Sequence, residues 1–334
     1  MKDKNIALLG YLVLAIGLVI LISGIAHIGK PLVFDGIGAD TSSDASADVS
    51  NDLFVSGTGE YIADDGYKNI VLASPSAVVY DENAGGYKVL KDSSAQYATG
   101  DFNLIVTAAV AVDKLGTEHN FAVTDLSLVP EGACLAGLQV GDSLSMNMML
   151  DALLVAHGAD AAYVVAVETA RVVADDKNME SSLAVASFVS MMNSYASSLG
   201  LSNTVFANPD GAFDSKQHST AADMCKVALA QLKNDLVIKS AGQKAVTHTF
   251  NNGRSVTFNN NNKMLDNKSS AQYFDYANGL LAWSLSDDLN CLIATANIKG
   301  DNVVAVTLGA KTTAETYADA IALFYPTLEK AVLN

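Results

Sequence analysis

An uncharged apolar run at residues 6–25 is the feature that most constrains this chain. Its length is about the 20 residues that a helix needs to cross the hydrocarbon core of a bilayer. Lys2 and Lys4 precede the run, whereas the next charges after Lys30 are acidic. Because cytoplasmic flanks tend to carry positive charges, the sequence predicts a single-pass cell-membrane anchor at residues 6–28, with a cytoplasmic tip at residues 1–5.

A cleaved secretory signal is the alternative interpretation, since residues 24–26 (Gly-Ile-Ala) have the small-x-small spacing of a cleavage site. The apolar run exceeds the roughly 7–15 residues usual in the core of such signals. An uncleaved anchor is therefore preferred. Under it, the N-terminus is cytoplasmic and the main domain is extracytoplasmic.

The organisation that follows is a spacer and then a folded domain. Residues 29–66 are rich in Asp, Ser and Gly and poor in large apolar side chains. Such a segment cannot bury enough surface to offset the entropy lost on ordering, so it is predicted to be an acidic flexible spacer. From residue 67 to 334, strand-like and helix-like patterns alternate with no second spacer. We expect one α/β domain of the α+β type there.

Charge and cysteine content exclude some functions. The chain has 36 Asp and Glu against 20 Lys and Arg, a formal net charge of -16. This charge repels phosphate backbones, so nucleic acid is not an expected partner. Cys134, Cys225 and Cys291 lie far apart without a Cys-x-x-Cys pair, so neither a zinc site nor a disulfide framework is predicted. No cofactor is expected.

Local patterns predict several elements of the domain. Ser143 or Ser145 is available to cap a helix, and Thr220 stands at capping-box spacing from Asp223. Apolar periodicity and turn residues place the other boundaries. The predicted elements are a hairpin of strands 77–80 and 87–90, helices 105–115, 145–157, 188–199, 220–232 and 313–333, and strands 292–296 and 303–309.

In chain order, these segments resemble the low-molecular-weight penicillin-binding proteins that act as serine D-Ala-D-Ala carboxypeptidases. The most specific stretch is 188–224, where Asn208, Pro209 and Gly211 recur in family order. The resemblance implies the fold shared with serine β-lactamases and D,D-peptidases, an antiparallel sheet flanked by helices. The other matching segments are 76–81, 107–113, 141–142, 150–156 and 160–162.

The resemblance also implies three catalytic motifs: Ser-x-x-Lys, Ser-x-Asn and Lys-Thr-Gly. In the family, the first serine attacks the penultimate D-Ala carbonyl and its lysine takes the proton. The second serine relays protons, and the strand lysine helps to hold the terminal carboxylate of the substrate.

The flanking matches place other residues at all three motifs. Neither Ser-x-x-Lys nor a Lys-Thr-Gly-like string occurs anywhere in the chain. Ser145 begins the one Ser-x-Asn string nearby, but it starts a helix well before the family's position. The replacing residues are Asp101 and Leu104 in the first motif, His157 and Ala159 in the second, and Leu281, Ala282 and Trp283 in the third.

These replacements predict a loss of catalysis. Leu104 cannot accept a proton, and the charge of Asp101 would repel an anionic substrate terminus. We expect Asp101, His157 and Trp283 to line a partly filled, less polar cleft. The first functional hypothesis is a membrane-anchored pseudoenzyme of the cell envelope that binds a peptidoglycan peptide or an envelope protein. The alternative is a cell-wall hydrolase with a rearranged site that uses Asp101 and His157.

Two further hypotheses concern nearby polar residues. His157 with Asp160 would form a new acid–base pair, whereas the plainer interpretation is that Asp160 hydrogen-bonds the following helix. Asp210, Asp214 and His218 are candidate metal ligands, but carboxylates in a loop with Gly and Pro commonly make turns. The sequence therefore predicts no metal site.

Overall fold

The computed structural model describes residues 54–55 and 58–333. The predicted cytoplasmic tip, the predicted anchor at 6–28 and most of the predicted spacer at 29–66 lie outside the described residues. Among the helices of the described part, none combines the length and the apolarity that crossing a membrane requires.

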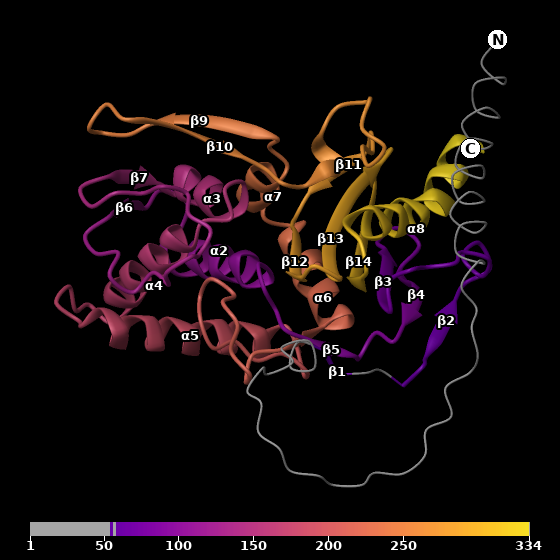
Figure 1. The fold of residues 1–334 in the computed structure, drawn as a ribbon, viewed down its shortest axis with the longest axis horizontal. Coiled ribbons are helices and arrows are strands. Elements are labelled where there is room, and N and C mark those ends of the chain that lie inside the picture. The colour runs from indigo at the N-terminus through magenta and orange to yellow at the C-terminus, as the bar shows by residue number, and fades with distance from the viewer. Residues whose placement is uncertain (1–53, 56–57, 334) are drawn as a thin grey trace, which may run out of the picture. The chain divides into compact units, whose positions relative to one another are not determined.

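The largest sheet has seven strands, which all pair antiparallel (Figure 1). The predicted hairpin at 77–90 forms its β3–β4 pair, and a two-residue turn at Lys299 and Gly300 joins the two long strands. In spatial order the strands are β11 (Ala277–Gly279), β13 (Leu289–Ile298), β14 (Asp301–Ala310), β3 (Ser76–Asp81), β4 (Gly86–Lys91) and β2 (Tyr61–Ala63), with β12 (Ala282–Ser286) also paired to β13.

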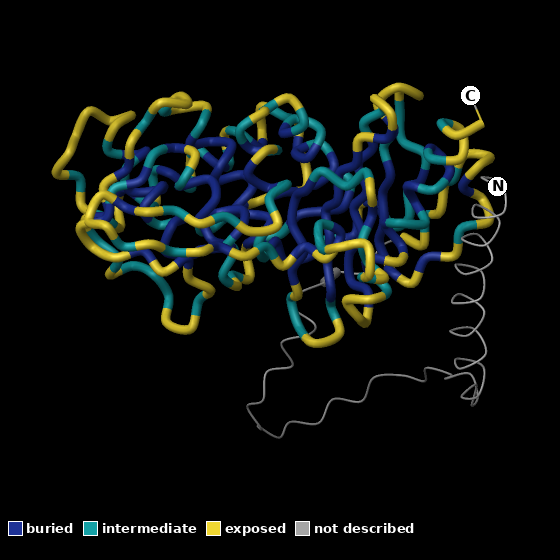
Figure 2. The backbone as a smooth tube through the Cα atoms, turned by 90° about the horizontal axis from the view of Figure 1, so that it is seen from above, coloured by how far each residue is buried: buried dark blue, intermediate teal, exposed yellow. Residues whose placement is uncertain are grey.

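Helices pack on both faces of this sheet, and Figure 2 shows the buried residues along the interior of the domain. Val79 and Ala305 belong to one apolar cluster together with Phe324 of the C-terminal helix. Val78 and Val304 belong to the other cluster, which the remaining helices complete. Neighbouring strand residues point to opposite faces, so strands covered on both sides are apolar nearly throughout. The helices are α2 (Phe102–Leu115), α3 (Met146–Leu154), α4 (Ala159–Val173), α5 (Ser181–Ser198), α6 (Ala221–Gln231), α7 (Asp235–Ala241) and α8 (Thr313–Leu333).

The predicted helix caps are present. Ser145 accepts a hydrogen bond from the amide of Met148 at the start of α3, and Thr220 accepts one from the amide of Asp223 at the start of α6. α5 begins at Ser181 rather than at residue 188, because the side chain of Glu180 accepts the first amides of a polar opening turn. Apolar periodicity does not reveal such a turn.

Part of the predicted spacer at 29–66 is strand, which corrects that boundary. β1 (Phe54–Val55) pairs with β5 (Gln96–Tyr97), and β2 pairs with the outer edge of β4. Both contacts are main-chain pairings that satisfy backbone groups, so a composition poor in large apolar residues does not exclude them. The remaining strands are β8 (Ser219–Thr220) next to β5, and the hairpins β6 (Asn120–Ala122) with β7 (Ser143–Ser145) and β9 (Ala245–Thr249) with β10 (Ser255–Asn259).

Candidate active site

Asp101 lies at the N-cap of α2, where the first family motif is expected. An aspartate at this position usually accepts a hydrogen bond from an amide of the first helical turn, but this one makes no such bond. Its Oδ2 instead lies 2.6 Å from Nδ1 of His157. The fold therefore joins residues that stand 56 positions apart, at the places where two different family motifs are expected.

His157 lies in the short connection between α3 and α4. Its backbone has φ 55, in the left-handed region that non-glycine residues seldom occupy. The imidazole is 5% exposed, against 34% for the Asp101 side chain. Its second nitrogen, Nε2, is buried without a hydrogen-bond partner among the described residues. The pair is thus anchored through Nδ1, while the opposite edge of the ring contacts neither solvent nor a nucleophile.

Asp160 does not pair with His157, contrary to the acid–base hypothesis. Its carboxylate accepts hydrogen bonds of 2.8 Å from the amides of Ala136, Gly137 and Leu138. A fourth bond, of 2.9 Å, comes from the amide of Ala161 in the first turn of α4. The side chain therefore fixes the loop before the site to the start of α4. The sequence indicated a bond to the following helix, but not the longer-range contact with this loop.

The other motif positions hold buried hydrocarbon. Leu104 and Leu281 belong to one apolar cluster, so neither a proton acceptor nor a cation stands where the family's two lysines are expected. Ala159 is buried at the start of α4. Ala282 belongs to the cluster on the opposite face of the sheet, so the structure does not bring its side chain to the site.

Trp283 covers the beginning of α2. Its side chain is buried, with 6% exposed. Its Cδ1 and Nε1 lie 2.5 and 2.6 Å from the position that a Cβ on Gly100 would occupy. Gly100, which precedes Asp101, also has φ 51, so a side chain there would be strained as well as blocked. The indole therefore occupies space beside Asp101, the position at which the family's nucleophile is expected.

A loop of residues 207–217 closes a further side of the site. The side-chain amide of Asn103 donates 2.7 Å hydrogen bonds to Asn208 O and Gln217 Oε1. Thr107 Oγ1 donates to Pro209 O at 2.7 Å. These contacts bind α2 to the Asn-Pro-Asp-Gly segment at 208–211, which the family resemblance and its turn residues had both indicated. Sequence analysis did not identify Asn103 as a site residue.

Asp210 lies buried in the same loop. Burial raises the pKa of this carboxyl, and the charge of Asp101 raises it further, whereas backbone hydrogen bonds lower it. Within the described residues, no group of three or more His, Cys, Asp or Glu is placed to hold a metal ion. Asp214 and His218 instead contact the backbone of Lys216.

Asp210→Asn is expected to make the protein more stable than wild type at pH 7, with the advantage vanishing at acid pH. Because the folded-state pKa of Asp210 is raised, the fold favours the protonated carboxyl, and stability is lost as pH rises through that pKa. Asparagine has no such ionisation. Urea unfolding between pH 4 and pH 7 measures the difference in stability between Asp210→Asn and wild type. The exposed Asp113→Asn is the control. A gap that does not change with pH would contradict this assignment.

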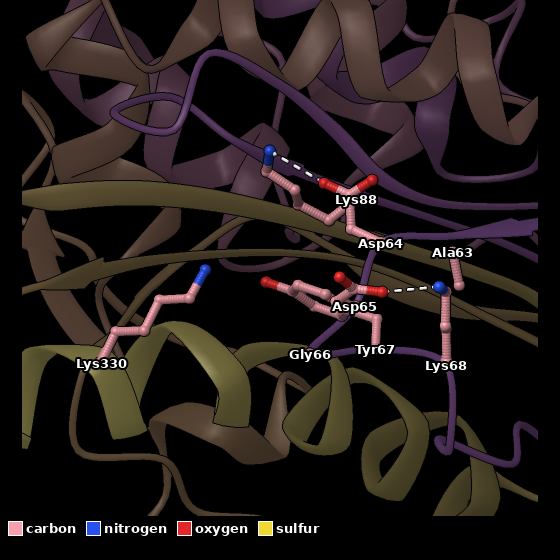
Figure 3. A pocket seen from close by; sticks show the side chains of 8 residues that line it. All are labelled: Ala63, Asp64, Asp65, Gly66, Tyr67, Lys68, Lys88 and Lys330. Atoms are coloured by element: carbon pink, nitrogen blue, oxygen red, sulfur yellow. Dashed lines mark hydrogen bonds and ion pairs between the residues drawn. The ribbon is translucent and has the colours of Figure 1, made fainter.

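A polar cavity of about 470 Å³ lies apart from this site, next to β2, β4 and α8 (Figure 3). Lys88 pairs with Asp64, and Lys68 pairs with Asp65. None of the motif positions lines this cavity, so it is not part of the candidate active site.

Comparison with known proteins relates the sequence and the fold to one family. The family profile described as D-alanyl-D-alanine carboxypeptidase (peptidase S11) matches residues 67–312. A D-alanyl-D-alanine carboxypeptidase of Streptomyces sp. strain K15 is 27% identical over 262 residues, which are 75% of this chain and 85% of the relative. D-alanyl-D-alanine carboxypeptidase DacF of Bacillus subtilis strain 168 is 25% identical over 261 residues, 76% of this chain and 62% of the relative.

Solved structures agree on the architecture. The crystal structure of the Streptomyces K15 DD-transpeptidase superposes with a TM-score of 0.68 at 25% identity and covers 78% of this chain and 98% of that chain. Penicillin-binding protein 6B from Escherichia coli superposes with a TM-score of 0.66 at 22% identity, over 80% of this chain and 81% of that one. The predicted antiparallel sheet flanked by helices is confirmed. With residues 67–312 matched by the family profile, this chain belongs to the D-alanyl-D-alanine carboxypeptidase family.

Proposed function

We propose that this chain is a catalytically inactive member of its family, anchored in the cell membrane, which binds a peptidoglycan peptide or an envelope protein without cleaving it. One observation carries the proposal. Asp101 stands in the place of the nucleophile and is bonded to His157, while Leu104 stands buried in the place of the base.

The chemistry of the family requires groups that these positions lack. Acyl transfer needs an oxygen nucleophile and a neighbouring group that removes its proton. Leucine has no basic atom, and a carboxylate is a weak nucleophile that repels the anionic end of a D-Ala-D-Ala peptide. In hydrolases of this kind, loss of the nucleophile or its base typically costs about a millionfold in rate. Leu281 further removes the cation that would hold the substrate carboxylate.

The contact between Asp101 and His157 favours a second candidate, a hydrolase with a rearranged site. A carboxylate that orients a histidine activates a nucleophile when the other ring nitrogen faces it. Here Nε2 of His157 is buried and contacts no hydroxyl or thiol among the described residues. The geometry therefore supports this candidate less well than the inactive one.

The proposed anchor and location rest on the N-terminal sequence. The uncharged run at 6–25, preceded by Lys2 and Lys4, supports a single-pass anchor with a cytoplasmic N-terminus. The acidic residues that follow would set the reach of the domain from the bilayer.

Fluorescent penicillin and a D-Ala-D-Ala pentapeptide test the proposal on the purified full chain. We expect no covalent penicillin adduct by gel fluorescence and mass spectrometry, and no release of D-Ala above the uncatalysed rate. An active D-alanyl-D-alanine carboxypeptidase serves as the positive control, and circular dichroism verifies that the chain is folded. Acylation or steady turnover would overturn the inactive assignment, and loss of that turnover in His157→Ala would support the rearranged hydrolase.

A further inference from the structure

We propose that the former catalytic site binds the ammonium group of a peptide, an inversion of the carboxylate recognition that the family's lysine would provide. The inference rests on the proposed function, because it assigns a ligand class to the same inactive site. Its first support is the charge of the site. Asp101 is one-third exposed, and its second oxygen, Oδ1, accepts no hydrogen bond from the residues that the structure describes.

A second carboxyl lies next to this part of the chain. Asp210 precedes Gly211, whose backbone packs on Gly100, the residue before Asp101. Burial and then the charge of Asp101 raise the pKa of the Asp210 carboxyl. Across residues 54–55 and 58–333, no Lys or Arg forms an ion pair with either side chain. With Leu281 in place of the family's lysine, the described part of the site has acceptors for an ammonium group and no Lys or Arg paired with them that would hold a carboxylate.

An independent observation points to a polar ligand at the same place. Trp283 is more than nine-tenths buried, and its Nε1 has no hydrogen-bond partner among the described residues. The edge of the indole that carries Nε1 lies against Gly100, one residue before Asp101. Buried polar atoms are nearly always paired, so an unpaired donor here calls for an acceptor from outside the chain. A peptide carbonyl supplies such an acceptor, whereas an ammonium group does not.

Two exposed apolar residues stand in loops that contact the site, and such residues suit the aliphatic part of an ammonium-bearing side chain. Leu135 is 55% exposed and follows Cys134, a thiol whose pKa is raised by burial and then by the charge of Asp101. Phe213 is 51% exposed and lies two residues after Gly211, whose backbone packs on Gly100. Lysine side chains bury their methylene stems on such surfaces while the charged end binds a carboxylate.

The test uses the purified full chain and four forms of one tripeptide, Nα-acetyl-L-Lys-D-Ala-D-Ala. The side-chain amine is free or acetylated, and the C-terminus is a carboxylate or an amide. Calorimetric titration at low ionic strength should show at least tenfold tighter binding for the free amine, whichever C-terminus is present. That preference should weaken as salt is added. Tighter binding of the acetylated peptide with a free carboxylate would overturn the proposal.

Asp101→Asn assigns the preference to this site. Asparagine retains an oxygen that accepts a hydrogen bond from His157, but it has no charge. The gain in affinity of the free-amine peptide over the acetylated peptide should therefore fall about tenfold. Asp113→Asn, at an exposed position of the same helix, makes the same change in net charge and should leave the gain intact. An unchanged gain in Asp101→Asn would overturn the proposal. Should that variant fail to fold, a wild-type preference insensitive to salt would overturn it instead.

The peptide series also separates this inference from the proposed function. Release of D-Ala from the carboxylate forms would overturn the inactive assignment, whatever the order of affinities. Binding without release, but with no preference for the amine, would overturn only the ammonium site.

Discussion

Asp160→Ala is expected to lower the free energy of unfolding by about 3 kcal/mol. The carboxylate is buried and accepts four amide hydrogen bonds, and two of its donors, the amides of Ala136 and Leu138, are themselves buried. A buried donor left without an acceptor costs roughly 1–3 kcal/mol. Urea unfolding at pH 7 measures the change. The exposed Asp113→Ala should shift stability by no more than about 0.5 kcal/mol.

The same substitution has a local chemical readout at Cys134. Burial is the main cause of its raised thiol pKa, and the charges of Asp101 and Asp160 add to it. Removal of Asp160 should therefore lower the thiol pKa, release the loop and speed alkylation of Cys134 by iodoacetamide. Asp160→Asn, which keeps one acceptor oxygen, should lie between wild type and alanine in stability. Equal stability of Asp160→Ala and wild type would show that the loop does not depend on this carboxylate.

Local patterns predicted the elements that bury a regular apolar face. The helix at 313–333 has the predicted bounds, and the β3–β4 hairpin follows the predicted alternation. α3 ends at Leu154 rather than at residue 157. Its apolar pattern continues past the last turn, but His157 adopts the left-handed conformation and ends the helix before that residue. Periodicity reports burial and does not report such a change of backbone direction.

The candidate site was predictable in its composition but not in its contacts. The flanking segments of the family placed Asp101, His157 and Trp283 at one cleft, because their order along the chain matches. Which carboxylate contacts His157 depends on how α2 packs against the connection between α3 and α4. Asp160 is nearer to His157 in sequence, but its carboxylate accepts hydrogen bonds from loop amides instead. Residues three positions apart share a face only within one helix, and His157 lies between α3 and α4 with a left-handed backbone. Its spacing from Asp160 is therefore a poor guide to whether the two side chains meet.

Gly211→Ala is expected to destabilise the protein by several kcal/mol and to disturb the site directly. A Cβ on this residue would lie 1.9 Å from the carbonyl oxygen of Gly100, far inside van der Waals contact. Gly211 also has φ 88, which alone costs an L-residue about 1–2 kcal/mol. The loop would have to move away from Gly100, and the hydrogen bonds of Asn103 to Asn208 and Gln217 would be strained with it.

Gly200→Ala separates the steric clash from the conformational cost of a positive φ. Gly200 has φ 67, but a Cβ there would meet no atom within 4 Å, so this variant carries the conformational cost alone, about 1–2 kcal/mol. The excess loss in Gly211→Ala over Gly200→Ala, measured by urea unfolding, reports the contact between the 207–217 loop and the residue before Asp101. Because that contact holds one side of the proposed ammonium site, Gly211→Ala should also weaken binding of the free-amine peptide, whereas Gly200→Ala should not. Similar losses of stability in the two variants would mean that the loop moves away from α2 at little cost, and that the site is not held closed by this contact.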